Sequence, residues 1–314
     1  MNSSIAFYRG QYLPLAECQM SLFDYGVMQG VIVGEMVRTF QHQPFHLKEH
    51  LQRLQFSLDA IGLKIDSSEK QLTEIVQHLV EQNGKYLPAE HDLGISILVT
   101  PGVNPAYAHL QNITTAPATN PTTKQEPTIL IYTFALPMSL WAMQTISGQK
   151  LTVPSIRQLP ENSIDPHIKT RSRLHWYLAD KEANKTEAGS RALLLNDEGF
   201  ITELSTANFF IVKEKTILTP TFDSTLNGIS QQMIQKLAMQ LNYPFQASQL
   251  TLSDILNADE AFSTSTPYCL LPVVSVNGVT IGNSLPGPIT TELVTTWSKE
   301  VGVDIFQQIQ LMAK

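Results

Sequence analysis

The stretch ALLLNDEGFITELSTANFFIV, residues 192–212, decides the architecture expected for the second half of the chain. Two apolar runs, 192–195 and 200–203, flank a turn that contains Gly199. Short apolar runs separated by a glycine-marked turn predict a β-hairpin. The hairpin ends in Glu203, and this carboxylate is the first candidate functional residue.

The second candidate is Lys169, in the segment HIKTRS at residues 167–172. It precedes Glu203 by 34 residues (203 − 169). A lysine and a carboxylate arranged to hold one heteroaromatic ring are what pyridoxal 5'-phosphate needs. The lysine forms a Schiff base with the cofactor aldehyde, and the carboxylate keeps the ring nitrogen protonated so that the ring accepts electrons. Taken alone, each residue is more simply a surface lysine or a solvated strand residue.

A third element strengthens the cofactor interpretation. Residues 226–230, LNGIS, run directly into an expected helix with an apolar face. The amides and the Ser230 hydroxyl at a helix N-terminus form an anion site suited to a phosphate ester. In isolation, Gly228 is explained equally well as an ordinary helix N-cap.

Two further groups are candidates for phosphate binding. Residues 264–267, Thr-Ser-Thr-Pro, place hydroxyl groups where an apolar strand ends, although a plain turn explains them equally. Arg53 flanks the apolar stripe of an expected helix, so its guanidinium can reach inward to a phosphate. The alternative for Arg53 is a partly covered surface arginine.

Apolar periodicity and turn residues predict the elements of the remaining chain. We expect strands at 36–40, 95–100, 128–134, 151–158, 209–212 and 216–218, and helices at 47–61, 71–84, 171–188, 229–241 and 288–302. A capping box at Ser68 and Gln71 marks the start of the second helix. Residues 101–127 form a long loop, which is either a lid or binding segment or merely disordered.

The domain organisation follows from this order of elements. We predict a small N-terminal α/β domain at residues 1–134, a linker at 135–140 and a larger C-terminal cofactor-binding domain at 141–314. The linker is placed after the last N-terminal strand because Pro137 prevents that strand from continuing.

Composition excludes several classes of protein. The chain has 314 residues, 43% hydrophobic and 16% charged, and its net charge is −7, with no basic run typical of a nucleic-acid surface. Cys18 and Cys269 fit two unpaired thiols in a reducing compartment better than a disulfide framework or a metal site. No export signal or membrane span is visible. The expected location is cytoplasmic, with no nucleic-acid or membrane partner.

These residues lie in a longer series of motifs that resembles one family. The chain resembles the class IV, fold-type IV pyridoxal-phosphate aminotransferases, the group of branched-chain and D-amino-acid aminotransferases and 4-amino-4-deoxychorismate lyase. The resemblance covers nearly the whole chain and is carried by Asp24-Tyr25-Gly26 with Gly30 and Glu35, His50-Leu51-x-Arg53-Leu54, Lys169-Thr170, Leu193 to Glu203, Ser205-x-Ala207-Asn208, Gly228-Ile229-Ser230, Asp259-Glu260-Ala261-Phe262, Pro272-Val273 and Ile281-Gly282.

The resemblance implies a fold and a set of roles. The fold would be α/β (α+β), with a small N-terminal α/β domain and a larger C-terminal pseudo-barrel domain. Lys169 would be the catalytic Schiff-base lysine, and Glu203 would contact the pyridine nitrogen. The other implied cofactor-binding residues are Arg53, Thr206, Leu226, Gly228, Ile229, Ser230, Ser265, Thr266 and Arg173. Relatives are homodimers, so a homodimer is expected here.

The sequence departs from the subfamily patterns where substrates are chosen. Gly34-Glu35-Met36 replaces the patterns typical of branched-chain and D-amino-acid enzymes, and Pro101-Gly102 stands where the latter carry an arginine. Arg38 alternates with Met36 and Phe40, so it points either into the pocket to bind a substrate carboxylate or to a salt bridge at the rim.

Three functions remain open from the sequence. The first is an aminotransferase acting between an amino acid, branched-chain-like or D, and a 2-oxo acid. The second is 4-amino-4-deoxychorismate lyase chemistry on the same scaffold. The third is a non-catalytic dimeric relative, which would bind no pyridoxal phosphate.

Overall fold

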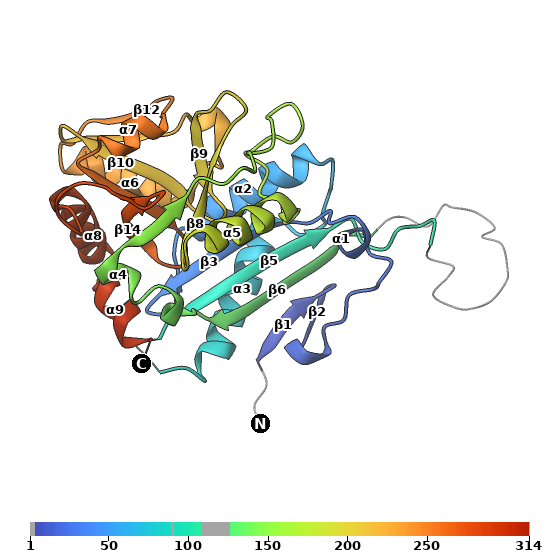
Figure 1. Ribbon diagram of the computed structural model, residues 1–314. Helices are drawn as coiled ribbons and strands as arrows, with labels where there is room; N and C mark the ends of the chain where they lie inside the picture. Colours follow the sequence, from blue (N-terminus) through green and yellow to red (C-terminus); the bar gives the residue numbers. More distant parts are fainter. Residues whose placement is uncertain (1–3, 89–90, 108–125, 314) are drawn as a thin grey trace. The chain divides into compact units, whose positions relative to one another are not determined.

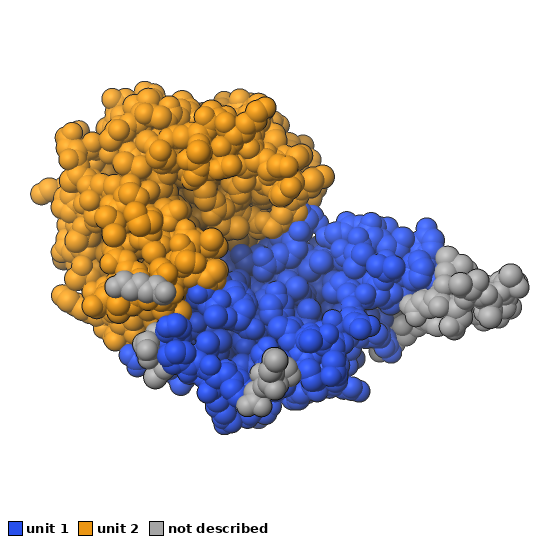
Figure 2. Space-filling model, turned by 60° about the horizontal axis from the view of Figure 1, so that its bottom comes forward, with its two compact units in different colours: residues 1–136, 168–172 blue, residues 137–167, 173–314 orange. Residues whose placement is uncertain are grey.

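The computed structural model describes residues 4–88, 91–107 and 126–313 (Figure 1). Contacts divide the chain into two compact units (Figure 2). Unit 1 comprises residues 1–136 and 168–172, and unit 2 comprises residues 137–167 and 173–314. The division after residue 136 lies inside the predicted linker, but the short segment 168–172, predicted as part of the C-terminal domain, packs with unit 1.

Unit 1 is a six-stranded antiparallel sheet in the order β2-β1-β6-β5-β3-β4. Its strands are β1 (Ile5–Tyr8), β2 (Gln11–Pro14), β3 (Val33–Phe40), β4 (Gln43–Pro44), β5 (Leu93–Thr100) and β6 (Thr128–Ala135). Its helices are η1 (Leu15–Glu17), α1 (Tyr25–Met28), α2 (Leu47–Ala60) and α3 (Glu69–Gly84).

Helices α2 and α3 lie against one face of this sheet (Figure 1). The apolar stripe of α2, including Leu51, Leu54 and Leu58, is buried there, as the sequence periodicity predicted. The capping box at Ser68 and Gln71 is present at the start of α3. These local signals are therefore confirmed.

The segment 168–172 joins unit 1 through backbone hydrogen bonds to the start of β3. Gly34 N donates to Lys169 O at 3.1 Å, and Arg171 N donates to Ile32 O at 2.7 Å. A β-bridge links Val33 and Thr170 between them. This pairing is distant in sequence, which explains why local patterns assigned the segment to the neighbouring domain.

Unit 2 is built on a nine-stranded mixed sheet in the order β12-β11-β10-β13-β14-β7-β8-β9, with β15 paired to β14. Its strands are β7 (Gln149–Thr152), β8 (Arg191–Leu195), β9 (Ile201–Leu204), β10 (Asn208–Lys213), β11 (Thr216–Thr219), β12 (Phe245–Ala247), β13 (Glu260–Ser265), β14 (Cys269–Val276) and β15 (Val279–Thr280). Its helices are η3 (Met138–Leu140), α4 (Gln144–Ser147), α5 (Leu174–Thr186), η4 (Phe222–Ser224), α6 (Ile229–Gln240), α7 (Leu252–Leu256), α8 (Pro288–Val301) and α9 (Ile305–Leu311).

The predicted hairpin is present as β8 and β9, which pair antiparallel. The strand expected at 151–158 is wrong beyond Thr152, where β7 ends. Pro154 lacks the N–H that a continued ladder would use. The chain instead turns toward β8, and Gln158 N donates to Leu195 O at 2.9 Å.

Three expectations about the whole chain can be placed here. No helix in the described ranges is long and apolar enough to cross a membrane. Cys18 and Cys269 form no disulfide. Of the long loop predicted at 101–127, residues 108–125 lie outside the described residues.

Candidate active site

Lys169 is held in unit 1 by its backbone. Its N–H donates to the Ser57 hydroxyl of α2 at 3.1 Å, and its carbonyl accepts from Gly34 of β3. The lysine is therefore fixed between the start of a strand and the middle of a helix, with its position set at both ends of the residue.

Beside this segment, unit 1 buries a charged cluster centred on Glu35. The Glu35 carboxylate is fully buried and accepts from Arg53 Nε and Nη2, both at 2.8 Å. His50 Nδ1 lies 2.7 Å from Glu35 Oε2. This arrangement places the Arg53 guanidinium on Glu35; phosphate binding by Arg53 stays a prediction.

Burial and charge shift the pKa values of this cluster. Burial alone would raise the pKa of the Glu35 carboxyl, but the charge and hydrogen bonds of Arg53, with those of His50, hold it far below its ordinary range. Burial lowers the pKa of His50, and the charges of Arg53 and Lys169 lower it further, against the effect of Glu35. Burial also lowers the pKa of Arg171. His50 is therefore neutral at pH 7 and the Glu35–Arg53 pair is ionised.

In unit 2, the predicted ring-nitrogen partner Glu203 lies on β9 and contacts another predicted cofactor residue. Glu203 Oε2 accepts from the Leu226 N–H at 3.2 Å, and Oε1 accepts from Gln158 Nε2 at 3.3 Å. The structure thus brings Glu203 and Leu226 together. Gln158 was missed because nothing in its local sequence links it to the hairpin.

The segment after Leu226 leads into α6, a 12-residue helix whose N-cap is Gly228. Asn208 of β10 donates from Nδ2 to Leu226 O at 2.9 Å. Its Oδ1 lies only 1.9 Å from the position that a Cβ on Gly228 would occupy. Only glycine fits there without movement, so the choice of Gly228 reflects more than an ordinary N-cap.

The start of α6 fits a phosphate ester. Ile229 and Ser230 are buried in its first turn, where helix amides have no partner inside the helix. Two polar atoms near this turn, Gln231 Nε2 and Thr264 Oγ1, are buried and have no hydrogen-bond partner within the described part of the chain. Because buried polar groups are almost always hydrogen-bonded, a ligand rich in acceptors suits this place.

Two turns of unit 2 that carry predicted residues are joined. The Ser265 hydroxyl donates to Thr206 O at 2.6 Å. Arg191 at the start of β8 donates from Nη2 to Thr206 Oγ1 at 3.1 Å and to the Ser205 hydroxyl. Thr266 follows in the same turn and is half-buried. Arg191 was missed because it lies at a strand start with no motif around it.

Arg173 and Arg38 lie in other surroundings. Arg173 is the N-cap of α5, and its guanidinium lies 5.9 Å from the ring of Trp176. Arg38 is 1% exposed, is paired with Asp92 at 3.7 Å and lies over the Phe40 ring. The ion-pair alternative therefore describes Arg38 in this structure, although the pair is buried and not at a rim.

Comparison with known proteins identifies the family. A model of the class IV amino-transferase family matches residues 33–276. A D-alanine aminotransferase of Bacillus licheniformis is 28% identical over 296 residues, covering 94% of this chain and 96% of the relative.

Solved structures agree with this match. A branched-chain amino acid aminotransferase of T.th., complexed with N-(5'-phosphopyridoxyl)-L-glutamate, has a TM-score of 0.81 at 25% identity and covers 96% of this chain and 95% of its own. The Escherichia coli branched-chain enzyme has a TM-score of 0.83 at 24% identity, with 95% and 94% covered. The expected fold-type IV architecture, a small antiparallel sheet followed by a curled mixed sheet, is thereby confirmed. The chain belongs to the class IV aminotransferase family.

Proposed function

We propose that this protein is a pyridoxal-phosphate-dependent aminotransferase that moves an amino group between an amino acid and a 2-oxo acid. Lys169 is its catalytic residue, and Glu203 holds the ring nitrogen. The observation that carries the proposal is the contact of Glu203 with the Leu226 N–H, directly before the helix start at Gly228. A carboxylate for the ring nitrogen and a cradle for the phosphate thus lie on the same short segment of unit 2.

Pyridoxal phosphate, when bound, withdraws electrons from the substrate α-carbon and so lowers the cost of removing its proton. Lys169 supplies the amine that holds the cofactor and carries that proton as general acid and base. The Glu203 carboxylate keeps the ring nitrogen charged. The first-turn amides of α6, the Ser230 hydroxyl and Thr266 bind the phosphate, and Leu226 contacts the ring.

The substrates belong to one of two groups. The relatives in the comparison are named as branched-chain and D-alanine aminotransferases, so the amino donor is proposed to be a branched-chain-like amino acid or a D-amino acid. A homodimer is proposed as well. The exposed apolar side chains Leu174 and Tyr177 of α5, 70% and 59% exposed, support an interface on that helix.

A panel of amino donors tests the proposal. The purified, cofactor-loaded protein is mixed with L-leucine, L-valine, D-alanine or D-glutamate, and the loss of visible absorbance of the lysine-bound cofactor is followed. At least one donor should bleach that band, and 2-oxoglutarate or pyruvate should restore it with one acceptor consumed per amino group moved. A colourless protein that takes up no cofactor, or pyruvate release from aminodeoxychorismate without an acceptor, would contradict the proposal.

A further inference from the structure

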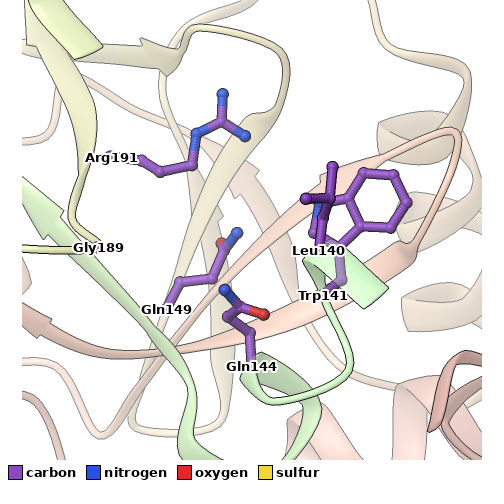
Figure 3. Close-up of a pocket in the computed structure, with 6 residues that line it drawn as sticks. All are labelled: Leu140, Trp141, Gln144, Gln149, Gly189 and Arg191. Atoms are coloured by element: carbon purple, nitrogen blue, oxygen red, sulfur yellow. The ribbon is translucent and has the colours of Figure 1, made fainter. Parts of the chain in front are cut away.

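Unit 2 contains a small cavity that the cofactor residues above do not line. Its volume is about 210 Å³, and it is lined by Leu140, Trp141, Gln144, Gln149, Gly189 and Arg191 (Figure 3). Ligand pockets typically measure roughly 300–1,000 Å³. The cavity therefore suits a compact molecule of amino-acid size and is too small for a nucleotide.

Among the described residues of this lining, Arg191 alone is charged. Its Nη2 donates to the hydroxyls of Ser205 and Thr206 and lies 3.5 Å from Asp180. No described residue accepts from its Nε or Nη1. The planar guanidinium fork matches a carboxylate, so the lining favours a small organic anion.

Two amides add polar groups to the cavity. The amide ends of Gln144 and Gln149 point toward one another in Figure 3. Gln149 is buried and accepts from the Ser263 hydroxyl at 2.6 Å. The Oε1 of Gln144 is buried and has no hydrogen-bond partner in the part of the chain that the structure describes. A ligand or water that brings an O–H or N–H would complete its surroundings.

The remaining wall is apolar. Trp141 and Leu140 stand on the side of the view opposite Arg191 (Figure 3). Leu140 is 62% exposed, and the Trp141 ring lies 5.4 Å from the ring of buried Tyr268. An apolar ligand side chain placed here would cover Leu140 and Trp141 from water, which stabilises the complex.

We propose that this cavity is a substrate subsite that binds the carboxylate of an amino acid or 2-oxo acid on Arg191 and its apolar side chain on Leu140 and Trp141. The assignment rests on the proposed function, which supplies this class of ligand. The same guanidinium holds Ser205 and Thr206, which follow Glu203 along the chain. A substrate on Arg191 is thereby bound next to the loop that carries the candidate cofactor residues.

Calorimetric titration of the full-length, cofactor-loaded protein with 4-methyl-2-oxopentanoate tests the subsite. A 2-oxo acid finds no amino group to accept in this form, so binding is measured without turnover. The matched probe is 4-methyl-2-pentanone, in which a methyl group replaces the carboxylate. Charge-assisted hydrogen bonds are strong, so Arg191→Gln should raise the Kd of the 2-oxo acid at least about tenfold. The ketone should bind weakly to both proteins.

Matched variants separate this effect from a general change in charge or fold. Lys150→Gln removes a positive charge from the neighbouring strand β7, whose Lys150 is paired with Glu187 at 3.1 Å, and should leave the Kd unchanged. Arg191→Lys keeps the charge and should weaken binding less than Arg191→Gln. Trp141→Ala does not alter the Ser205–Thr206 turn and should weaken binding of 4-methyl-2-oxopentanoate more than that of pyruvate.

Steady-state kinetics completes the test. The loss of affinity in Arg191→Gln should appear in KM for the 2-oxo acid more than in kcat. An unchanged Kd, an equal affinity for the ketone, or a raised Kd with an unchanged KM would overturn the subsite. Any of these results in an active wild-type enzyme leaves the proposed function standing, whereas a wild-type protein without amino transfer refutes the proposed function itself.

Discussion

The side-chain amide of Asn208 and the backbone carbonyl of Leu226 form a hydrogen bond of 2.9 Å that ties β10 to the segment before α6. The N–H of the same Leu226 donates to Glu203 at 3.2 Å. Both polar groups of one peptide residue are thus held by side chains from two strands. The carboxylate proposed for the ring nitrogen and the helix start proposed for the phosphate are therefore set at a fixed spacing.

Asn208→Ala should loosen this spacing. The Leu226 carbonyl would lose its donor, and an unsatisfied buried group costs about 1–3 kcal/mol. We expect the affinity for pyridoxal phosphate, measured by equilibrium titration, to fall by about fivefold or more. Asn227→Ala, at the exposed neighbouring position, is the control and should bind normally. Equal affinities of the two variants would show that the contact does not position the site.

Glu203→Gln should retain the cofactor and lose turnover. The amide keeps the shape of the side chain but cannot hold a charged ring nitrogen. We expect kcat to fall at least about tenfold, or about 1.4 kcal/mol of barrier. Glu198→Gln, in the exposed turn of the same hairpin, should leave kcat unchanged. A near wild-type kcat in Glu203→Gln would contradict the ring-nitrogen role.

The Glu35 cluster predicts a loss of stability in acid. His50 has a folded pKa below its ordinary 6.5, and Glu35 has one far below its ordinary 4.5. In both cases the unfolded chain binds protons that the folded chain does not, so stability falls as pH decreases. The decline should begin near pH 6.5 through His50 and steepen below about 4.5 through Glu35. Urea unfolding between pH 8 and 4 measures it.

Two variants assign the parts of that profile. His50→Gln should remove the decline between pH 6.5 and 5. Glu35→Gln should destabilise the protein at pH 7 by about 3–5 kcal/mol, because it leaves the Arg53 charge buried without its partner. A wild-type stability independent of pH from 8 to 5 would contradict the assignment of a neutral, buried His50.

Arg38→Met separates the two interpretations of Arg38. The buried pair with Asp92 at 3.7 Å implies a loss of about 3–5 kcal/mol of stability, with KM for substrates little changed. Arg9→Met removes an exposed pair with Glu126, which should cost at most about 1 kcal/mol. A large rise in KM with normal stability in Arg38→Met would instead favour the substrate-carboxylate role.

The sequence predicted those features whose causes are local. The stripe of α2, the capping box at Ser68 and the hairpin from Arg191 to Leu204 each depend on residues a few positions apart. Contacts between distant segments were not predictable. Neither the pairing of Thr170 with Val33 nor the bonds of Arg191 to the Ser205–Thr206 turn has a local signal.

Candidate residues divide in the same way. Glu203 and Gly228 were found through motifs, and the structure adds the physical reason for Gly228 in the proximity of Asn208 Oδ1. The Glu35–His50–Arg53 cluster had a partial signal. His50 and Arg53 are three residues apart on one helix and border its buried stripe, yet only the fold brings Glu35 of β3 to them.

The central claim is that Lys169 holds the cofactor, and the absorbance spectrum of Lys169→Ala tests it most directly. Wild-type protein incubated with pyridoxal phosphate should show the visible band of a lysine-bound cofactor and transfer amino groups. Lys169→Ala should lose both, while Lys185→Ala, on the exposed face of α5, should keep both. A Lys169→Ala protein that retains the band and the activity would contradict the account.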